Sequence, residues 1–345
     1  MADLAQRTYR LLRPLLFRLD PESAHACTLA LLNAAYRLQL LQTPPARAGT
    51  PLRILGLEFP NRIGIAAGFD KNGTCIDALG ALGFGFIEVG TVTPLAQPGN
   101  ARPRIFRIVA AQAIINSMGF PNGGVINLCA RLRARRFHGV CGVNIGKNAV
   151  TPLERAEEDY RACLRAVYPL ADYVTVNISS PNTAGLRQLQ QGERLGSLLE
   201  SLRATRTELA AEQGRHVPLL VKLSPDLTDA QLAETAAVIA AQGIDGVIAT
   251  NTTLARPAVA GLPAADRPGG LSGPPLHELA TATVRKLRAL LGARMPIIGV
   301  GGIDSPRAAR DMFAAGADLV QLYSGLIYHG PGLVSELCLA QSTVG

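Results

Sequence analysis

The sequence predicts an α/β fold: a (β/α)8 TIM barrel with an N-terminal two-helix extension. Eight short aliphatic or β-branched segments recur along the chain, nearly continuously apolar as strands buried on both faces should be. Helical patterns lie between most of these segments. The alternative, a doubly wound open sheet, has less support because no G-x-G-x-x-G follows the first segment.

The predicted strands are short, and most end in a small or polar residue. They are 63-IGIAAG-68, 86-FIEVGT-91, 140-VCGVNIG-146, 173-YVTVNIS-179, 218-PLLVKLS-224, 246-GVIATN-251, 296-PIIGVGG-302 and 318-DLVQLYSG-325. The clearest helical patterns between them are 154-ERAEEDYRACLRAVY-168, 229-DAQLAETAAVIAAQG-243 and 305-SPRAARDMFAAGA-317. Strands and helices that alternate in this way build a barrel of parallel strands with an outer ring of helices.

Residues 1–42 differ from the rest, because they are both leucine-rich and basic. They predict a helical hairpin, with helices over about 3–18 and 21–41, in which Asp20 caps the second helix and Pro21 takes its first position. Two interpretations stay open: the helices pack on the main domain, or they dip into a membrane interface where arginines meet lipid headgroups. A proline-rich linker, 43-TPPARAGTP-51, leads into the barrel domain, residues 43–345.

Composition excludes several classes of protein. The net charge of +8 comes without a dense basic cluster interleaved with aromatics, so we expect an anionic small molecule or membrane surface as partner and no nucleic acid. No secretory signal peptide and no long apolar window stand out. No cysteine pair forms a CxxC or a metal-ligand array, so we expect no metal site and six buried thiols in a reducing compartment: Cys27, Cys75, Cys129, Cys141, Cys163 and Cys338.

Polar side chains gather at the carboxyl ends of the predicted strands, where barrel enzymes carry their active sites. The glycine-rich ends 299-GVGGI-303 and 323-YSG-325 lie where barrels bind phosphate, and 269-GGLSG-273 is similar. Tight turns are the alternative use of these glycines. Lys222 ends the fifth strand and suits either a Schiff-base nucleophile or a fixed cation beside an electron-accepting ring.

Asparagines form a second group at these ends. Asn116, Asn177, Asn182 and Asn251 each offer amide donors and an acceptor. Several amides around one pocket would suit a flat ligand edged with N–H and C=O groups, such as a pyrimidine. Lys71 would then pair with a carboxylate on that ring.

The motifs together resemble the dihydroorotate dehydrogenases. They are 66-AAGFDKNG-73, 90-GTVTPLAQPGNARPRIFR-107, 115-INSMGFPN-122, 142-GVNIGKN-148, 177-NISSPNTAGLR-187, 247-VIATNTT-253, 269-GGLSG-273, 298-IGVGGI-303 and 321-QLYSG-325. The likeness extends in order over nearly the whole chain and includes 20-DPESAH-25. The hairpin, with serine rather than cysteine at position 180, is typical of the membrane-associated, quinone-dependent class 2; the soluble fumarate- or NAD-linked classes generally have cysteine there.

The resemblance implies a set of ligand contacts. For FMN these would be Ala66, Ala67, Gly68, Phe69, Asp70, Thr91, Asn144, Asn177, Lys222, Thr250, Gly273, Gly302, Tyr323 and Ser324. For the substrate they would be Lys71, Asn116, Ser117, Met118, Gly119, Phe120, Asn177, Asn182, Asn251 and Thr252. Ser117 departs from the arginine usual in the family, which puts a contact from this side chain in doubt.

The resemblance also implies an activity. Dihydroorotate would be oxidised to orotate in pyrimidine (UMP) biosynthesis, with Ser180 as general base, and electrons would pass through FMN to ubiquinone or menaquinone. His25, Arg107 and Tyr323 resemble residues that line the quinone entrance, although His25 would also suit a local bond in its own helix. The expected protein is a monomer in peripheral contact with lipid, on the cytoplasmic side of a bacterial inner membrane.

Three rival functions stay open from sequence. They are a soluble flavin barrel that reduces fumarate or NAD, an aldolase with Lys222 as Schiff base, and a binding barrel without turnover.

Overall fold

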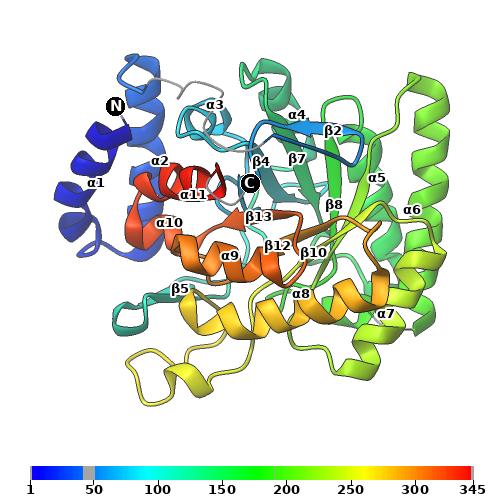
Figure 1. Ribbon diagram of the computed structural model, residues 1–345. Coiled ribbons are helices and arrows are strands. Elements are labelled where there is room, and N and C mark those ends of the chain that lie inside the picture. The colour runs from blue at the N-terminus through cyan, green and yellow to red at the C-terminus, as the bar shows by residue number, and fades with distance from the viewer. Residues whose placement is uncertain (1, 42–50, 191, 343–345) are drawn as a thin grey trace.

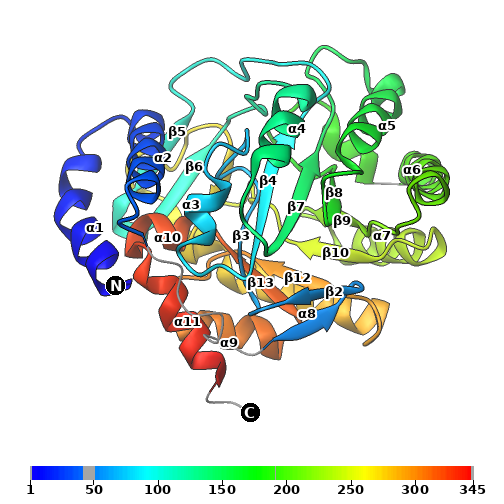
Figure 2. The same cartoon turned by 90° about the horizontal axis from the view of Figure 1, so that it is seen from above.

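The predicted strands pair side by side into a closed barrel of parallel strands, which excludes the open sheet (Figures 1 and 2). A computed structural model describes residues 2–41, 51–190 and 192–342. Around the barrel the strands are β3 (Ile63–Ile65), β4 (Phe86–Val92), β7 (Val140–Ile145), β8 (Tyr173–Asn177), β9 (Leu219–Leu223), β10 (Gly246–Ala249), β12 (Ile297–Val300) and β13 (Leu319–Leu322). All eight predicted strands are therefore confirmed.

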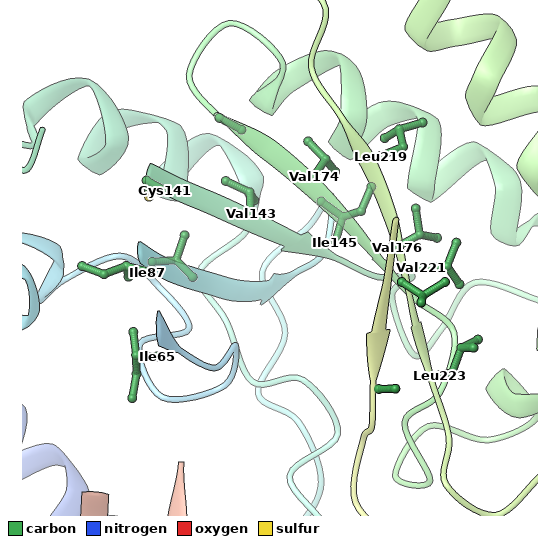
Figure 3. Close-up of a cluster of buried hydrophobic side chains, with 14 of the residues drawn as sticks. Ile65, Ile87, Cys141, Val143, Ile145, Val174, Val176, Leu219, Val221 and Leu223 are labelled. Atoms are coloured by element: carbon green, nitrogen blue, oxygen red, sulfur yellow. The ribbon is translucent and has the colours of Figure 1, made fainter. Parts of the chain in front are cut away.

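Side chains alternate along each strand between the helices outside and the barrel interior. The outward residues are aliphatic, as Figure 3 shows for Ile87, Val143 and Val176, and they pack against the helices. The helices are α3 (Ile76–Gly80), α4 (Val125–Ala134), α5 (Ala156–Val167), α6 (Gly192–Gln213), α7 (Asp229–Ala241), α8 (His277–Leu291), α9 (Pro306–Ala314), α10 (Ser324–His329) and α11 (Gly332–Ser342). The helices predicted over 154–168, 229–243 and 305–317 correspond to α5, α7 and α9.

Aromatic rings fill the end of the barrel opposite the polar strand ends. Phe86 and Tyr173 point inward and are fully buried. Phe59 meets Phe86 edge to face, with ring centroids 5.3 Å apart. Phe59 belongs to the antiparallel hairpin of β1 (Leu52–Ile54) and β2 (Leu57–Phe59), which the sequence analysis did not predict. This end is therefore a closed apolar core.

A small antiparallel sheet lies outside the barrel, in segments that the sequence analysis treated only as motifs. It comprises β5 (Ile105–Ile108), β6 (Ala113–Asn116) and β11 (Gly270–Ser272). The central strand β6 pairs Asn116 with both Ile105 and Gly270. This pairing fixes the backbone of Asn116. Short 3₁₀ helices occur at Val109–Ala111, Leu153–Arg155, Leu186–Gln190, Pro257–Val259 and Pro274–Leu276.

The N-terminal hairpin comprises α1 (Ala2–Leu16) and α2 (Pro21–Arg37), beside α10 and α11 (Figures 1 and 2). Asp20 caps α2 as predicted, since its Oδ1 accepts from the amides of Glu22 (3.1 Å) and Ser23 (2.9 Å). None of the described helices is long and apolar enough to cross a membrane.

Polar contacts attach this hairpin to the barrel domain. Gln6 and Arg13 donate to the carbonyls of His329 (2.7 Å) and Tyr328 (2.9 Å) in the α10 segment. Glu22 forms a 2.6 Å ion pair with the buried Arg104. The two helices are thus held against the barrel.

One expectation about the cysteines is wrong. Cys27 is exposed, whereas the other five thiols are buried, and none of the six forms a disulfide within the described part of the chain. The reason is that α2 lies on the surface and buries only Ala24, so its far side faces solvent. Of the predicted linker 43–51, residues 43–50 lie outside the described part of the chain.

We expect Gly64→Ala to destabilise the protein. Gly64 points inward, and a Cβ there would overlap with the ring of Phe86. Forced overpacking of this kind costs about 1–3 kcal/mol. The matched control is Gly196→Ala on α6, where a Cβ would meet no atom within 4 Å. Urea unfolding should show a lower midpoint for the first variant only; equal midpoints would contradict this packing.

Candidate active site

A cavity of about 130 Å³, the site cavity, opens at the carboxyl ends of the barrel strands. Most of the residues predicted for ligand binding come together in its wall. They are Ala66, Ala67, Gly68, Lys71, Thr91, Asn116, Met118, Gly119, Phe120, Asn177, Ser180, Asn182, Lys222, Thr250, Asn251, Thr252, Gly273, Gly302, Tyr323 and Ser324. Residues from 66 to 324 thus converge on one small volume.

Four of the residues predicted to contact FMN or the substrate lie outside this wall. Asn144 is buried beneath it, where it bonds to Thr91. Asp70 is buried and accepts from the backbone amides at the start of α3, including that of Cys75. Phe69 lines a second cavity. Ser117 holds its loop through backbone bonds, and its side chain lines neither cavity.

Glu88 lies midway along β4, inside the barrel and 1% exposed. Its carboxylate accepts from the Tyr173 hydroxyl (2.9 Å), the Gln321 amide (2.7 Å) and the Asn144 amide (2.8 Å). Because a carboxylate only accepts hydrogen bonds, Asn144 turns its NH2 toward Glu88. Its carbonyl oxygen Oδ1 then faces the site.

The orientation of Asn144 determines that of the next amides. Asn144 Oδ1 accepts from the Thr91 hydroxyl (2.5 Å) and from Asn177 Nδ2 (3.2 Å). Asn177 therefore turns its own Oδ1 away, toward Asn251 Nδ2 (3.4 Å). One buried carboxylate thus sets the direction of three amides, two of which line the site cavity.

Lys222 stands beside this network, since it pairs in register with Asn177 on the neighbouring strand. It is 5% exposed, and burial lowers the pKa of its ammonium group, while the carboxylate of Glu88 opposes the shift. Glu88 therefore favours the charged form of Lys222. The inner wall of the site therefore carries a buried amine, whose charged form Glu88 supports and burial opposes.

Lys71 and Tyr323 stand where the two cavities meet. Lys71 Nζ donates to the carbonyl of Gly68 (2.6 Å), and the Tyr323 hydroxyl donates to the same oxygen (3.2 Å). Burial lowers the pKa of Lys71 to about 8, so the amine is still mostly protonated at pH 7. Lys71 is a second cation, suited to an anionic group.

Ser180 is buried in the wall of the site cavity, where its Oγ accepts from the backbone amide of Asn182 (3.2 Å). Asn182 Nδ2 donates in turn to Asn116 Oδ1 (3.1 Å). Within residues 2–41, 51–190 and 192–342, no imidazole or carboxylate hydrogen-bonds the Ser180 hydroxyl. A proton taken by Ser180 must therefore move on to water or another hydroxyl.

The backbone of two glycines and the hydroxyls of two serines form another part of the wall of the site cavity. Gly273 and Gly302 have φ of 104° and 65°, and a Cβ on Gly302 would crowd His277 and the Gly273 carbonyl. The hydroxyls of Ser272 and Ser324 are 2.8 Å apart. This wall suits the oxygens of a phosphate group.

A second cavity of about 350 Å³, the hairpin cavity, lies between α1, α2 and the barrel. Its wall is mostly aliphatic, and it includes His25 and Arg107 as predicted. The walls of both cavities contain Lys71, Asn116, Met118, Ser272 and Tyr323. The two cavities therefore meet at these five residues.

Arg107 and His25 connect the hairpin to the barrel domain at the hairpin cavity. Arg107 donates to the carbonyl of Leu19 (3.0 Å) and stacks over the ring of Phe17, 4.7 Å from its centroid. His25 Nε2 lies 2.8 Å from the carbonyl of Phe69, and the two rings meet edge to face at 5.1 Å. The local bond that was the alternative for His25 is thus replaced by a bond to the barrel domain.

Sequence reasoning missed Glu88, Ser272 and Gln321. Ser272 and Gln321 lay within motifs already quoted, and both Glu88 and Gln321 lie in strand interiors. The available signal was alternation: Glu88 comes two residues after the inward-facing Phe86, and Gln321 comes two residues before Tyr323, which lines the site. A polar residue at an inward position of a buried strand needs a partner in the barrel.

The fold and these contacts define a β/α-barrel enzyme whose site suits a planar, anionic ligand. Comparison with known proteins identifies the family: the profile of "Dihydroorotate dehydrogenase" matches residues 51–340, and the chain belongs to that family.

Known relatives align with this chain over nearly their whole length. Proteins named "Dihydroorotate dehydrogenase (quinone)" from Thiobacillus denitrificans and Chromobacterium violaceum are 57% and 58% identical, over 95% and 96% of this chain and 97% of each relative. The crystal structure of DHODH from Eimeria tenella in complex with ferulenol is similar, with a TM-score of 0.87 and 36% identity over 94% of this chain and 95% of that one.

We expect His25 to make stability depend on pH. Burial, and next the charge of Lys71, lower the pKa of His25 from 6.5 to about 4. Between these values the unfolded chain binds a proton that the folded protein does not, so stability falls as pH falls from about 6.5 to about 4. Unfolding of wild type and His25→Gln across this range checks the effect. The wild type should lose more stability than the variant, and parallel curves would contradict the buried, neutral imidazole.

Proposed function

We propose that this protein oxidises (S)-dihydroorotate to orotate, a step of de novo pyrimidine (UMP) biosynthesis, and passes the electrons through FMN to a membrane quinone. One observation carries the proposal: the polar site cavity contains Ser180, Lys71 and Lys222 and meets an apolar cavity under the hairpin. The quinone-dependent names of relatives at 57% and 58% identity support the same acceptor.

The residues present fit FMN. Gly273, Gly302 and Ser324 would hold the phosphate, and Ala67 and Lys222, which line the same cavity, would contact the ring system. FMN, when bound, would supply the acceptor for the hydride and the means of passing the two electrons on to quinone. Lys222, whose charged form Glu88 favours, would when protonated stabilise negative charge on the reduced ring.

The chain's own side chains would orient the substrate. Lys71 would pair with its carboxylate, and the amides of Asn116, Asn177, Asn182 and Asn251 would bond to the ring N–H and C=O groups. Their directions are already fixed by hydrogen bonds among themselves. Because these side chains are ordered before the substrate binds, less binding energy is needed to hold C6 next to the hydride acceptor.

Ser180 would act as general base. Oxidation breaks the C5–H bond as a proton leaves and the C6–H bond as a hydride leaves, which forms the double bond of orotate. Ser180 Oγ would take the C5 proton and pass its own hydroxyl proton onward. Burial of Ser180 excludes bulk water from this exchange.

Quinone would enter through the hairpin cavity. Its aliphatic wall suits a lipid-soluble molecule, and the neutral His25 with Arg107 and Tyr323 would offer hydrogen bonds at its inner end. In this account residues 1–42 form the membrane-associating unit and residues 43–345 the catalytic one. We propose a monomer bound peripherally to the cytoplasmic side of a bacterial inner membrane.

The visible spectrum of the pure protein tests this function. We expect a yellow protein whose flavin band bleaches when dihydroorotate is added without oxygen. Reoxidation should be fast with a ubiquinone or menaquinone analogue and slow with fumarate or NAD. A colourless protein would contradict the cofactor, and preferential turnover with fumarate or NAD would contradict the acceptor.

We expect Ser180→Ala to retain FMN and to lose flavin reduction by about a hundredfold or more, the usual share of a general base. Stopped-flow reduction by dihydroorotate measures this rate. The control is Ser201→Ala on the outer helix α6, which should behave as wild type. A near-normal rate for Ser180→Ala would reject the assignment.

A further inference from the structure

A third cavity, of about 660 Å³, lies outside both cavities described above. It is bordered by the end of α2, the segment around α3, and the end of α4. We call it the basic cavity, because four arginines line it: Arg37, Arg131, Arg135 and Arg136. Neither the reaction nor the quinone path uses it.

Two of these arginines have no anionic partner in the part of the chain that the structure describes. Among the described residues, ion pairs of 4.0 Å or less involve neither Arg37 nor Arg136, and both side chains are exposed. Arg131 bonds only to a neutral amide, that of Asn127 (3.1 Å). Arg135 differs, since it pairs with Asp172 (3.1 Å).

The one carboxylate in the wall of the basic cavity is already occupied. Asp77 Oδ1 accepts from the backbone amides of Arg136 (2.8 Å) and Phe137 (2.9 Å). Asp77 thus anchors the segment after α4 and does not pair with a guanidinium. The cavity keeps an excess of positive charge, which suits an anion with several oxygens.

The surroundings of the basic cavity indicate where that anion comes from. Leu41 lines both the basic cavity and the hairpin cavity. Leu38 and Leu40, next to it in sequence, are 69% and 62% exposed. Leu31, in the wall of the hairpin cavity, is 54% exposed. Apolar side chains that project beside unpaired arginines are the arrangement of a surface that enters the lipid headgroup layer.

We propose that the basic cavity binds the phosphate of an anionic phospholipid headgroup, with Arg37 and Arg136 as its main contacts. Phosphate bound there places the exposed leucines in the acyl layer and the mouth of the hairpin cavity at the membrane. The inference rests on the proposed function in one respect: a cavity mouth placed at the membrane would let quinone enter. Binding of the headgroup itself does not depend on catalysis.

Vesicle binding tests the site. The full-length, FMN-loaded protein is mixed with phosphatidylcholine vesicles that contain no or about a third phosphatidylglycerol, and bound protein is measured by flotation. Arg37→Gln with Arg136→Gln should weaken binding to the anionic vesicles by about tenfold or more, since each basic residue near an anionic surface contributes about 1 kcal/mol.

The control carries the same change in net charge. Arg285 and Arg294 are exposed and have no ion pair within the described ranges, and they belong to α8 and the segment after it. Their double change to glutamine should leave vesicle binding within about twofold of wild type. Equal losses in the two double variants would overturn the site, because total charge would then explain both.

Inorganic phosphate distinguishes the source of the anion. At equal ionic strength, phosphate should release no more protein from the vesicles than chloride does. Selective release by phosphate, with saturable phosphate binding to the free protein, would overturn the lipid assignment in favour of a soluble phosphate ligand.

Catalysis is measured separately. Flavin reduction by dihydroorotate in the absence of vesicles should be the same in both double variants and wild type. Failure of reduction in all three proteins would contradict the proposed function and leave the vesicle result standing.

Discussion

A carboxylate can only accept hydrogen bonds, and the side chain of Glu88 places one in the middle of the barrel, where Asn144, Tyr173 and Gln321 each donate to it. The direction of Asn144 follows from this, and then the directions of Asn177 and Asn251. Lys222 gains a counter-charge from the same group. The pattern of donors and acceptors that a ligand would meet is therefore set below the site.

The hairpin depends on the barrel in a comparable way. Its helices bury few side chains of their own and are held by polar contacts, among them the pairing of Glu22 with Arg104 and of Arg107 with the loop carbonyls. Arg104 immediately precedes β5, and Arg107 lies within it. The antiparallel sheet therefore supports both the hairpin and Asn116 of the site. The same sheet thus supports the walls of both the hairpin cavity and the site cavity.

Strand and helix patterns in the sequence were sufficient for the barrel and the hairpin, because buried parallel strands have continuous apolar patterns. Convergence of strand ends indicated Lys222 and the asparagines, and the resemblance to the dihydroorotate dehydrogenases supplied most of the other residues of the site wall. It did not predict the sheet of β5, β6 and β11, whose strands are too short and irregular for a periodic signal. Nor did it predict Glu88 or the exposure of Cys27. Alternation along the strand indicates that Glu88 faces the barrel interior, but its partners depend on which strands pack together. The exposure of Cys27 also depends on packing, of which a single residue carries no sign.

The role of Glu88 is tested most directly by the affinity for FMN of Glu88→Gln. The amide presents a donor where three donors converge, so Asn144 and its partners lose their fixed direction, and FMN should bind about tenfold or more weakly. Thr175→Val is the matched control, because Thr175 is also buried in the barrel and its Oγ1 has no hydrogen-bond partner among the described residues. We predict weak FMN binding in a folded Glu88→Gln protein and wild-type binding in Thr175→Val; equal affinity in the two variants would contradict the account.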